Sequence, residues 1–339
     1  MNVMIIKLLT LLVSFVLFLN SGAIVNAQSE TYEGQVTRII EENGNYQKLE
    51  ITSNDKTYEI ENGLYESSQN IKYKVNDKVV VTDGMITDYV RRPMLYLLLS
   101  IFIIATIMVA GKWGVSSIIG MAYSFYVIFV LILPSILDGK DPVVSAIVGS
   151  IFIIPVTFGL SHGLNRKTIV AAIGTLISMI LIGLLSLLFV NLAKLTGFAV
   201  EEAGFLQYQL GGIINMKGIL LAGIIISSLG VMDDITVSQS SIVEELRLAN
   251  PKLSKSELFI RSMRVGKDHI SSMVNTLVLV YAGASLPLLL IFVNNPHPFS
   301  EILNYEIIAD EIVRTMVGSI GLILAVPITT YIAVQASKK

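Results

Sequence analysis

The sequence has no cysteine, few histidines and little charge, and each shortage excludes a kind of chemistry. Without cysteine, the 339 residues hold no disulfide, no thiolate metal site and no cysteine nucleophile. The three histidines, His162, His269 and His297, have no histidine three or four residues away, so a zinc site of paired histidines is not expected. Charged residues make up only 15% of the chain and hydrophobic residues 53%, whereas soluble domains carry about 25% charge. This balance indicates a protein that lies in a lipid bilayer.

Motifs of several enzyme and ATPase classes are also missing. The sequence contains no Walker loop, no G-x-S-x-G, no H-E-x-x-H and no dinucleotide fingerprint, so ATP-driven transport within this chain is disfavoured. Asp234 and Asp268 lack the Gly-x-Gly-Asp context expected of an intramembrane aspartyl protease. We predict that the chain is not an enzyme and holds no cofactor. The sequence does not decide whether it binds a metal ion. A net charge of −2 argues against nucleic acid as a partner.

The N-terminal part divides into two segments of different composition. Residues 1–27 have a basic start, a short apolar run and a small-residue end, an order typical of a signal peptide, with an uncleaved anchor helix as the alternative. Residues 28–92 alternate short runs of Val, Ile, Tyr and Thr with turn formers such as Asn43-Gly44-Asn45. This pattern predicts an extracytoplasmic, β-rich domain, built as a small antiparallel sheet or barrel.

The surface of that domain is expected to be solvated or to bind a partner. A cation site is the alternative, and its candidate ligands are Glu41, Glu42 and Glu50.

Residues 93–339 predict a polytopic helical membrane domain. Helices rather than barrel strands follow from the length of the apolar runs, because a helix needs about 20 residues to cross a bilayer. The fold class is therefore a mainly α membrane protein with about seven transmembrane helices. The predicted spans lie near 93–111, 115–137, 143–161, 168–191, 217–242, 271–293 and 312–334.

Basic residues indicate the orientation of these spans. If the domain at 28–92 is exported, most Lys and Arg of the connections, together with Lys338 and Lys339, lie on the cytoplasmic side, and acidic residues such as Glu306 and Asp310 lie outside. This distribution follows the positive-inside rule. We predict a multi-pass plasma-membrane protein with an extracytoplasmic N-terminal domain and a cytoplasmic C-terminus.

A cytoplasmic helix–turn–helix is expected near 243–270. Asn250-Pro251 stops one helix, and Ser254 with Glu257 forms a capping box that starts the next. The second helix is mixed in character and is expected to lie along the inner membrane surface. Its basic residues could also suggest nucleic-acid binding, but the positive-inside rule explains them better.

Two adjacent carboxylates are the strongest functional candidates. Only 15 apolar residues separate Lys217 from Asp233, so the helix is expected to carry Asp233 and Asp234 to membrane depth, where a shared proton or a bound cation would relieve the charge. The alternative is that the pair ends the helix at the cytoplasmic surface. A polar stripe recurs at intervals of three and four, and should face other helices or a water-filled cavity. It comprises Ser227, Gly230, Asp234, Ser238, Ser241 and Glu245.

The returning segment supplies a second polar set. Asp268 and Asn275 share a helical face with Ser271 or Ser272, and we expect Asp268, His269 and Asn275 to lie across from the aspartates as relay or ligand. An imidazole such as that of His269 could relay protons. A plain residue of the membrane interface is the alternative for this lone histidine.

Three motifs carry a family resemblance. With Gly230-Val231-Met232-Asp233-Asp234-Ile235-Thr236, Val265-Gly266-Lys267-Asp268-His269-Ile270 and the run from Asn275 to Pro287, the chain resembles the YibE/F-like family of bacterial membrane proteins. The resemblance extends from about Tyr32 to the C-terminus. It implies a bacterial multi-pass protein, often accompanied by a related membrane protein, and it implies no activity.

Two functions of different classes follow. The first is a proton- or cation-coupled permease or exporter, or a subunit of one, whose ion or small-molecule substrate is unknown. The Gly-x-x-Asp-Asp helix is also similar, by analogy, to the proton-relay half of RND-type exporters. The second is a non-transporting scaffold or sensor whose exterior domain binds an envelope partner.

Overall fold

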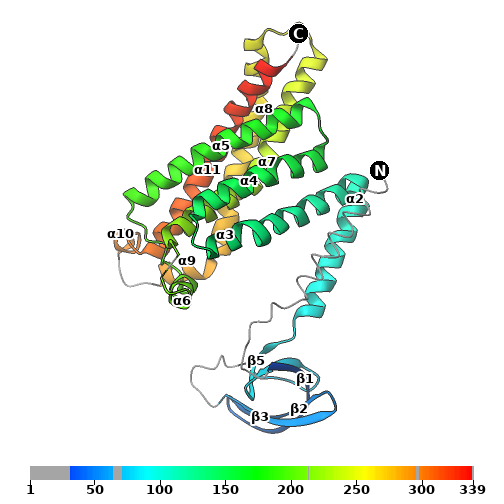
Figure 1. The fold of residues 1–339 in the computed structure, drawn as a ribbon, viewed down its shortest axis with the longest axis vertical. Helices are drawn as coiled ribbons and strands as arrows, with labels where there is room; N and C mark the ends of the chain where they lie inside the picture. Colours follow the sequence, from blue (N-terminus) through cyan, green and yellow to red (C-terminus); the bar gives the residue numbers. More distant parts are fainter. Residues whose placement is uncertain (1–30, 64–70, 213, 295–297, 338–339) are drawn as a thin grey trace. The chain divides into compact units, whose positions relative to one another are not determined.

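A computed structural model of the chain describes residues 31–63, 71–212, 214–294 and 298–337 (Figure 1). The chain divides into two compact units, Met1–Gly111 and Lys112–Lys339, which are described separately. The predicted signal peptide at 1–27 lies outside the described residues.

The N-terminal unit contains a five-stranded antiparallel sheet in the order β3-β2-β1-β4-β5. Its strands are β1 (Thr31–Asn43), β2 (Tyr46–Ser53), β3 (Lys56–Asn62), β4 (Lys78–Thr82) and β5 (Met85–Tyr89). Two-residue turns join β1 to β2, β2 to β3 and β4 to β5, and Asn54 and Asp55 at one of them have positive φ angles of 46° and 62°, as tight hairpins require. Side chains alternate between the two faces of a strand, and Leu49 and Ile51 accordingly share the buried face of β2. The predicted small antiparallel sheet is confirmed.

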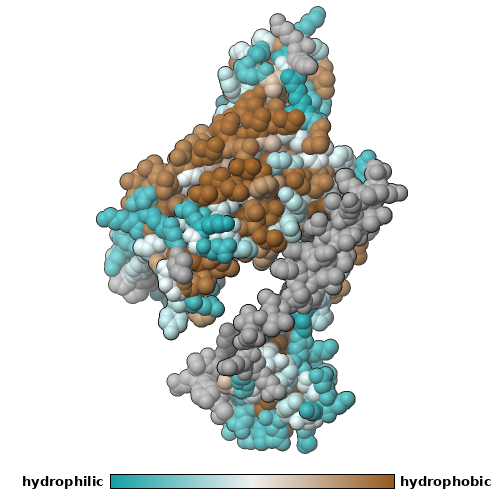
Figure 2. All heavy atoms as spheres, viewed as in Figure 1, coloured by the Kyte–Doolittle hydropathy of each residue, from teal (hydrophilic) through white to brown (hydrophobic). Residues whose placement is uncertain are grey.

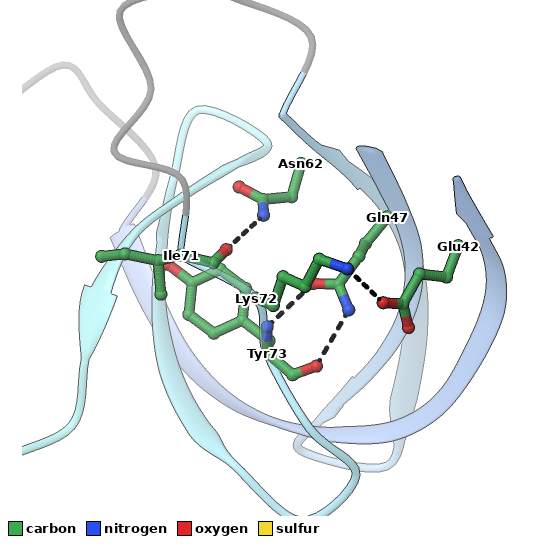
Figure 3. Close-up of polar contacts among 6 residues, drawn as sticks. All are labelled: Glu42, Gln47, Asn62, Ile71, Lys72 and Tyr73. Carbon is green, nitrogen blue, oxygen red and sulfur yellow. Dashed lines mark hydrogen bonds and ion pairs between the residues drawn. The ribbon is translucent and has the colours of Figure 1, made fainter. Parts of the chain in front are cut away.

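A buried glutamine holds the segment that precedes β4 against the sheet (Figure 3). Gln47 is 1% exposed. Its Nε2 donates a hydrogen bond to the carbonyl oxygen of Tyr73 (3.1 Å), and its Oε1 accepts one from the Tyr73 amide (2.8 Å). Nearby, an exposed ion pair joins Lys72 Nζ to Glu42 Oε1 at 2.7 Å, and this contact lowers the pKa of Glu42.

Replacing Gln47 with leucine should therefore expose the Tyr73 segment to solvent exchange. The buried amide and carbonyl of Tyr73 would each lose a partner, at a cost of about 1–3 kcal/mol each. We expect hydrogen–deuterium exchange of the Tyr73 amide in the full chain to become at least about tenfold faster. Lys72→Gln, which breaks the exposed ion pair with Glu42 and leaves the Gln47 side chain in place, should leave that rate nearly unchanged, and equal rates in both variants would contradict this account.

The helical unit begins within α2. This helix (Arg92–Val127) is interrupted at Gly111, whose φ of 56° and ψ of −129° are not helical. The remaining elements are η1 (Ile128–Ile132), α3 (Leu133–Leu137), α4 (Pro142–His162), α5 (Arg166–Leu192), α6 (Glu201–Gln209), α7 (Met216–Ala249), α8 (Lys255–Ala284), α9 (Leu286–Val293), α10 (Phe299–Ile302) and α11 (Glu306–Ala336).

Five helical stretches are long and apolar enough to cross a membrane, so the described residues do not confirm the predicted count of about seven. The predicted spans 93–111 and 115–137 fall in one stretch of 46 residues, Arg92–Leu137. The predicted span 271–293 is divided between α8 and α9. Pro287 explains this division, because proline has no amide to continue the helical hydrogen bonds.

The centre of the helical unit is formed by α5, α7 and α11, which pack on one another (Figure 1). Glycines permit the close approach of α5 and α11: a Cβ at Gly174 would overlap Thr329, and a Cβ at Gly321 would overlap Ile182. On the face shown in Figure 2, a broad hydrophobic area covers the helices of this unit, and many of their large apolar side chains are exposed. A hydrophobic exterior together with apolar helices of this length fits a membrane protein.

Candidate functional site

Asp233 and Asp234 lie in the interior of α7 and do not end it. Asn215 caps the start of this helix by accepting a hydrogen bond from the Gly218 amide, and the helix continues to Ala249. Asp233 is about 26 Å along the axis from the first helical residue, at 1.5 Å per residue. The alternative that the pair terminates the helix is therefore wrong, because no stop signal occurs before Asn250-Pro251.

Asp233 lines a cavity of about 420 Å³ between α2, η1, α4 and α7. Three hydroxyl-bearing residues also line it, Ser124 on α2 and Thr157 and Ser161 on α4. Ser124 and Thr157 donate their hydroxyl protons to carbonyl oxygens of their own helices, at 3.1 and 2.9 Å. Their oxygen lone pairs are therefore still able to accept a proton donor or to coordinate a cation. Most other lining residues are apolar or glycine: Gly120, Met121, Ile128, Ile153, Phe158, Ile226, Leu229 and Gly230.

The carboxylate of Asp233 is incompletely satisfied. Its Oδ1 is buried and has no hydrogen-bond partner among the described residues. The groups that act on it electrostatically are His162, at the end of α4, and the neighbouring Asp234. A buried carboxylate oxygen without a donor is unfavourable when ionised, so a proton or a cation is its natural partner.

The predicted polar stripe occupies the more accessible side of α7. Ser227, Ser238 and Ser241 are half-buried, whereas Gly230, Asp234 and Glu245 are exposed. Asp234 follows Asp233 by one residue, which turns it about 100° around the helix. The two carboxylates are therefore in different surroundings, and only Asp233 lines the cavity.

The opposite side of α7 carries buried polar contacts that the sequence analysis did not identify. Thr236 and Thr175 of α5 share a hydrogen bond of 2.8 Å. Gln239 Nε2 donates to Thr330 Oγ1 of α11 (2.7 Å) and to the Ser262 carbonyl of α8 (3.1 Å). These contacts fix α7 against three neighbouring helices.

The second predicted set is not brought to the aspartates. Asp268 and Asn275 are exposed and His269 is half-buried. Within the part of the chain that the structure describes, no hydrogen bond or ion pair joins any of the three to Asp233 or Asp234. The cause is the rotation of α8: the buried Gly266 faces Gln239 and Val326. Asp268, two positions later, is turned about 200° away from that contact.

A second buried carboxylate lies on α11. Asp310 is 8% exposed, and its Oδ1 has no hydrogen-bond partner among the described residues. One turn earlier, Glu306 accepts hydrogen bonds from the Thr196 hydroxyl (2.7 Å) and the Gly197 amide (3.1 Å). The sequence analysis had treated Glu306 and Asp310 only as exterior acidic residues. Their spacing of four, on one face of an apolar helix, was the signal available.

Among the described residues, no group of three or more His, Cys, Asp or Glu side chains is placed to hold a metal ion. An ion at Asp233 would therefore depend on one carboxylate and on hydroxyl or carbonyl oxygens. Hard cations such as the alkali metals, and protons, are compatible with such ligands.

Comparison with known proteins gives one match. The sequence pattern of the family described as YibE/F-like protein matches residues 98–339. Searches among curated proteins and among solved structures find no match. The matched region contains α4, α5, α7, α8 and α11, together with all residues that line the cavity. The resemblance noted from the motifs is thus confirmed, and the chain belongs to the family of YibE/F-like proteins.

Proposed function

We propose that this membrane protein is a proton- or cation-coupled permease or exporter, or a subunit of one, and that Asp233 binds the coupling ion. One observation supports this above all others. A carboxylate in the interior of an apolar helix has a buried oxygen with no hydrogen-bond partner in the described part of the chain, and it lines a cavity together with three hydroxyl-bearing residues. Ionisable groups within membrane helices mark ion or proton pathways as a rule.

The surroundings of Asp233 are suited to reversible ion binding. In the ion-free state, its charge would be opposed by poor solvation and by Asp234. Binding of a proton or a monovalent cation would remove that charge. The half-buried position of Asp233 allows the ion to enter and leave.

The proposal includes the arrangement of the chain in the membrane. The N-terminal β unit would be extracytoplasmic and the C-terminus cytoplasmic, in the plasma membrane, as the distribution of basic residues favours. The 46 residues of Arg92–Leu137 would form a straight helix about 69 Å long at 1.5 Å per residue, more than twice the thickness of a hydrocarbon core. It would contribute two crossings that meet near Gly111.

The cysteine-free sequence makes this orientation directly testable. Lys56→Cys in the β unit and Lys252→Cys after α7 each place one thiol at an exposed position. A membrane-impermeant maleimide should label position 56 in intact cells and position 252 only after permeabilisation. Labelling of both positions in intact cells, or of 252 alone, would contradict the proposed orientation.

Transport is tested with the purified full chain in proteoliposomes. Proton movement would be followed with an internal pH-sensitive dye, and sodium and potassium movement with isotope tracers, under an imposed gradient of each ion. We expect a flux of at least one of these ions above that of protein-free vesicles. The scaffold or sensor would be supported instead by two results together. None of the three ions would move, and deletion of residues 28–92 alone would abolish the function of the protein in cells.

A related membrane protein is the proposed partner. The accessible polar side of α7 is unfavourable against lipid. A second membrane protein that covers Ser227, Ser238 and Ser241 would shield these polar side chains from lipid and would close the site from the bilayer. Co-purification of such a protein from native membranes tests this part of the proposal.

A further inference from the structure

A second pocket lies where the ends of α5, α7 and α11 meet, and it has a different chemistry from the aspartate cavity. Its volume is about 200 Å³. The start of α5 contributes Arg166 and Lys167, and the end of α7 contributes Glu244 and Arg247. The remaining lining residues are Val170, Ser240, Val243, Leu248, Ala333, Ala336 and Ser337.

The charged side chains give the pocket an excess of positive charge. Three of them are cationic and one is anionic. Glu244 offsets only part of this charge, because it lies 3.8 Å from Lys167 Nζ and no ion pair links it to Arg166 or Arg247 within the described residues. Arg166 is at the first position of α5, where helical amides also favour an anion.

Arg247 is held in place before any ligand arrives. Its Nη1 donates hydrogen bonds to the carbonyl oxygens of Leu253 (2.7 Å) and Pro251 (3.2 Å), and its Nη2 donates to Ser337 Oγ (3.3 Å). Its Nε is buried and has no acceptor among the described residues. A guanidinium that lines the pocket and is fixed by these hydrogen bonds is suited to bind an oxyanion.

The pocket is also amphiphilic in a consistent direction. Residues four apart share one face of a helix. On α5, Val170 lies one turn further into the helix than Arg166, and on α7, Val243 lies one turn further in than Arg247. On these two helices the arginines thus lie nearer the helix ends than the valines that follow them into the pocket. This order matches a phosphate headgroup followed by an acyl chain.

We propose that this pocket binds the phosphate group of an anionic phospholipid. The positive-inside rule explains why basic residues lie near the ends of membrane helices. It does not explain a cavity among three helix ends, or an arginine that lines it and is fixed by hydrogen bonds. The phosphate would accept hydrogen bonds from Arg247 and Arg166, and Lys167 would add charge. This site is separate from Asp233, so the proposal stands whether or not the chain transports an ion.

The test compares lipid binding by full-length variants. Native mass spectrometry of the detergent-purified chain would be used with added phosphatidylglycerol, phosphatidylcholine or inorganic phosphate. We expect wild type to retain phosphatidylglycerol in preference to phosphatidylcholine, and the double variant Arg166→Gln, Lys167→Gln to bind phosphatidylglycerol roughly tenfold more weakly. Arg264→Gln, which removes an exposed charge of α8 outside the pocket, is the matched control and should bind as wild type does.

The remaining outcomes show whether the pocket binds the phosphate group of a lipid or free inorganic phosphate. Competition by millimolar inorganic phosphate, with no preference between the two lipids, would overturn a lipid source and support a site for free phosphate. Equal phosphatidylglycerol binding by wild type, the double variant and Arg264→Gln would overturn the proposal. Thermal denaturation without lipid should be the same for the two variants, which separates lost binding from lost folding.

Discussion

Replacing Asp233 with asparagine is expected to abolish ion-coupled flux while the amount of protein in the membrane stays the same. The change keeps the shape of the side chain and removes its charge and its titratable proton. The site would no longer alternate between an ionised and a neutralised state, which coupling requires. We expect flux in proteoliposomes to fall to the level of protein-free vesicles, a loss of more than about tenfold. Folding should be preserved, because the variant removes an unfavourable buried charge.

Two further substitutions sharpen this prediction. Asp268→Asn changes an exposed carboxylate of α8 that the structure does not bring to the cavity, and it should leave flux close to that of wild type. Asp234→Asn, at an exposed position next to the cavity, should give a flux between that of Asp233→Asn and that of wild type, because the repulsion between the two carboxylates is lost. If Asp233→Asn transports as wild type does, or if Asp268→Asn is the more damaging, Asp233 is not the coupling site.

The β unit and α7 show why some features follow from the sequence alone. Hairpin turns are specified by the few residues that form them, so the turn at Asn54 and Asp55 could be placed without knowledge of the rest of the molecule. The end of α7 is equally local. No proline lies within α7, and the helix ends with Asn250 as its C-cap, directly before Pro251. The capping box at Ser254 and Glu257 likewise starts α8 as predicted.

The cavity could not be assembled in the same way. Periodicity within one helix identifies a polar face, but it does not reveal which other helix that face meets. The stripe through Ser238 and Ser241 lies on the accessible side of α7, whereas the cavity takes its hydroxyls from Ser124 and Thr157 on two other helices. Those hydroxyls are isolated within apolar runs. Their meeting depends on helix rotation, which is decided by long-range packing.

The packing of α5 on α11 gives the second large prediction, which concerns stability. A side chain at Gly321 would overlap Ile182, which is fully buried. Gly321→Leu should therefore separate the two helices or force strained rotamers, at a cost of about 1–3 kcal/mol or more. We expect the monodisperse peak in size-exclusion chromatography to disappear after heating to a lower temperature than for wild type. The same change at Gly283, where a Cβ has no neighbour within 4 Å among the described residues, should have little effect.

A second-site change distinguishes this overlap from a general intolerance of leucine. Ile182→Ala alone should destabilise the unit by about 2–5 kcal/mol, because it leaves a cavity in the core. Combined with Gly321→Leu, the new side chain would fill that cavity at nearly constant total volume, which cores tolerate best. The double variant should thus be more stable than either single variant. If the two losses simply add, the helices are not in contact at these positions, and the packing of α5 on α11 would have to be revised.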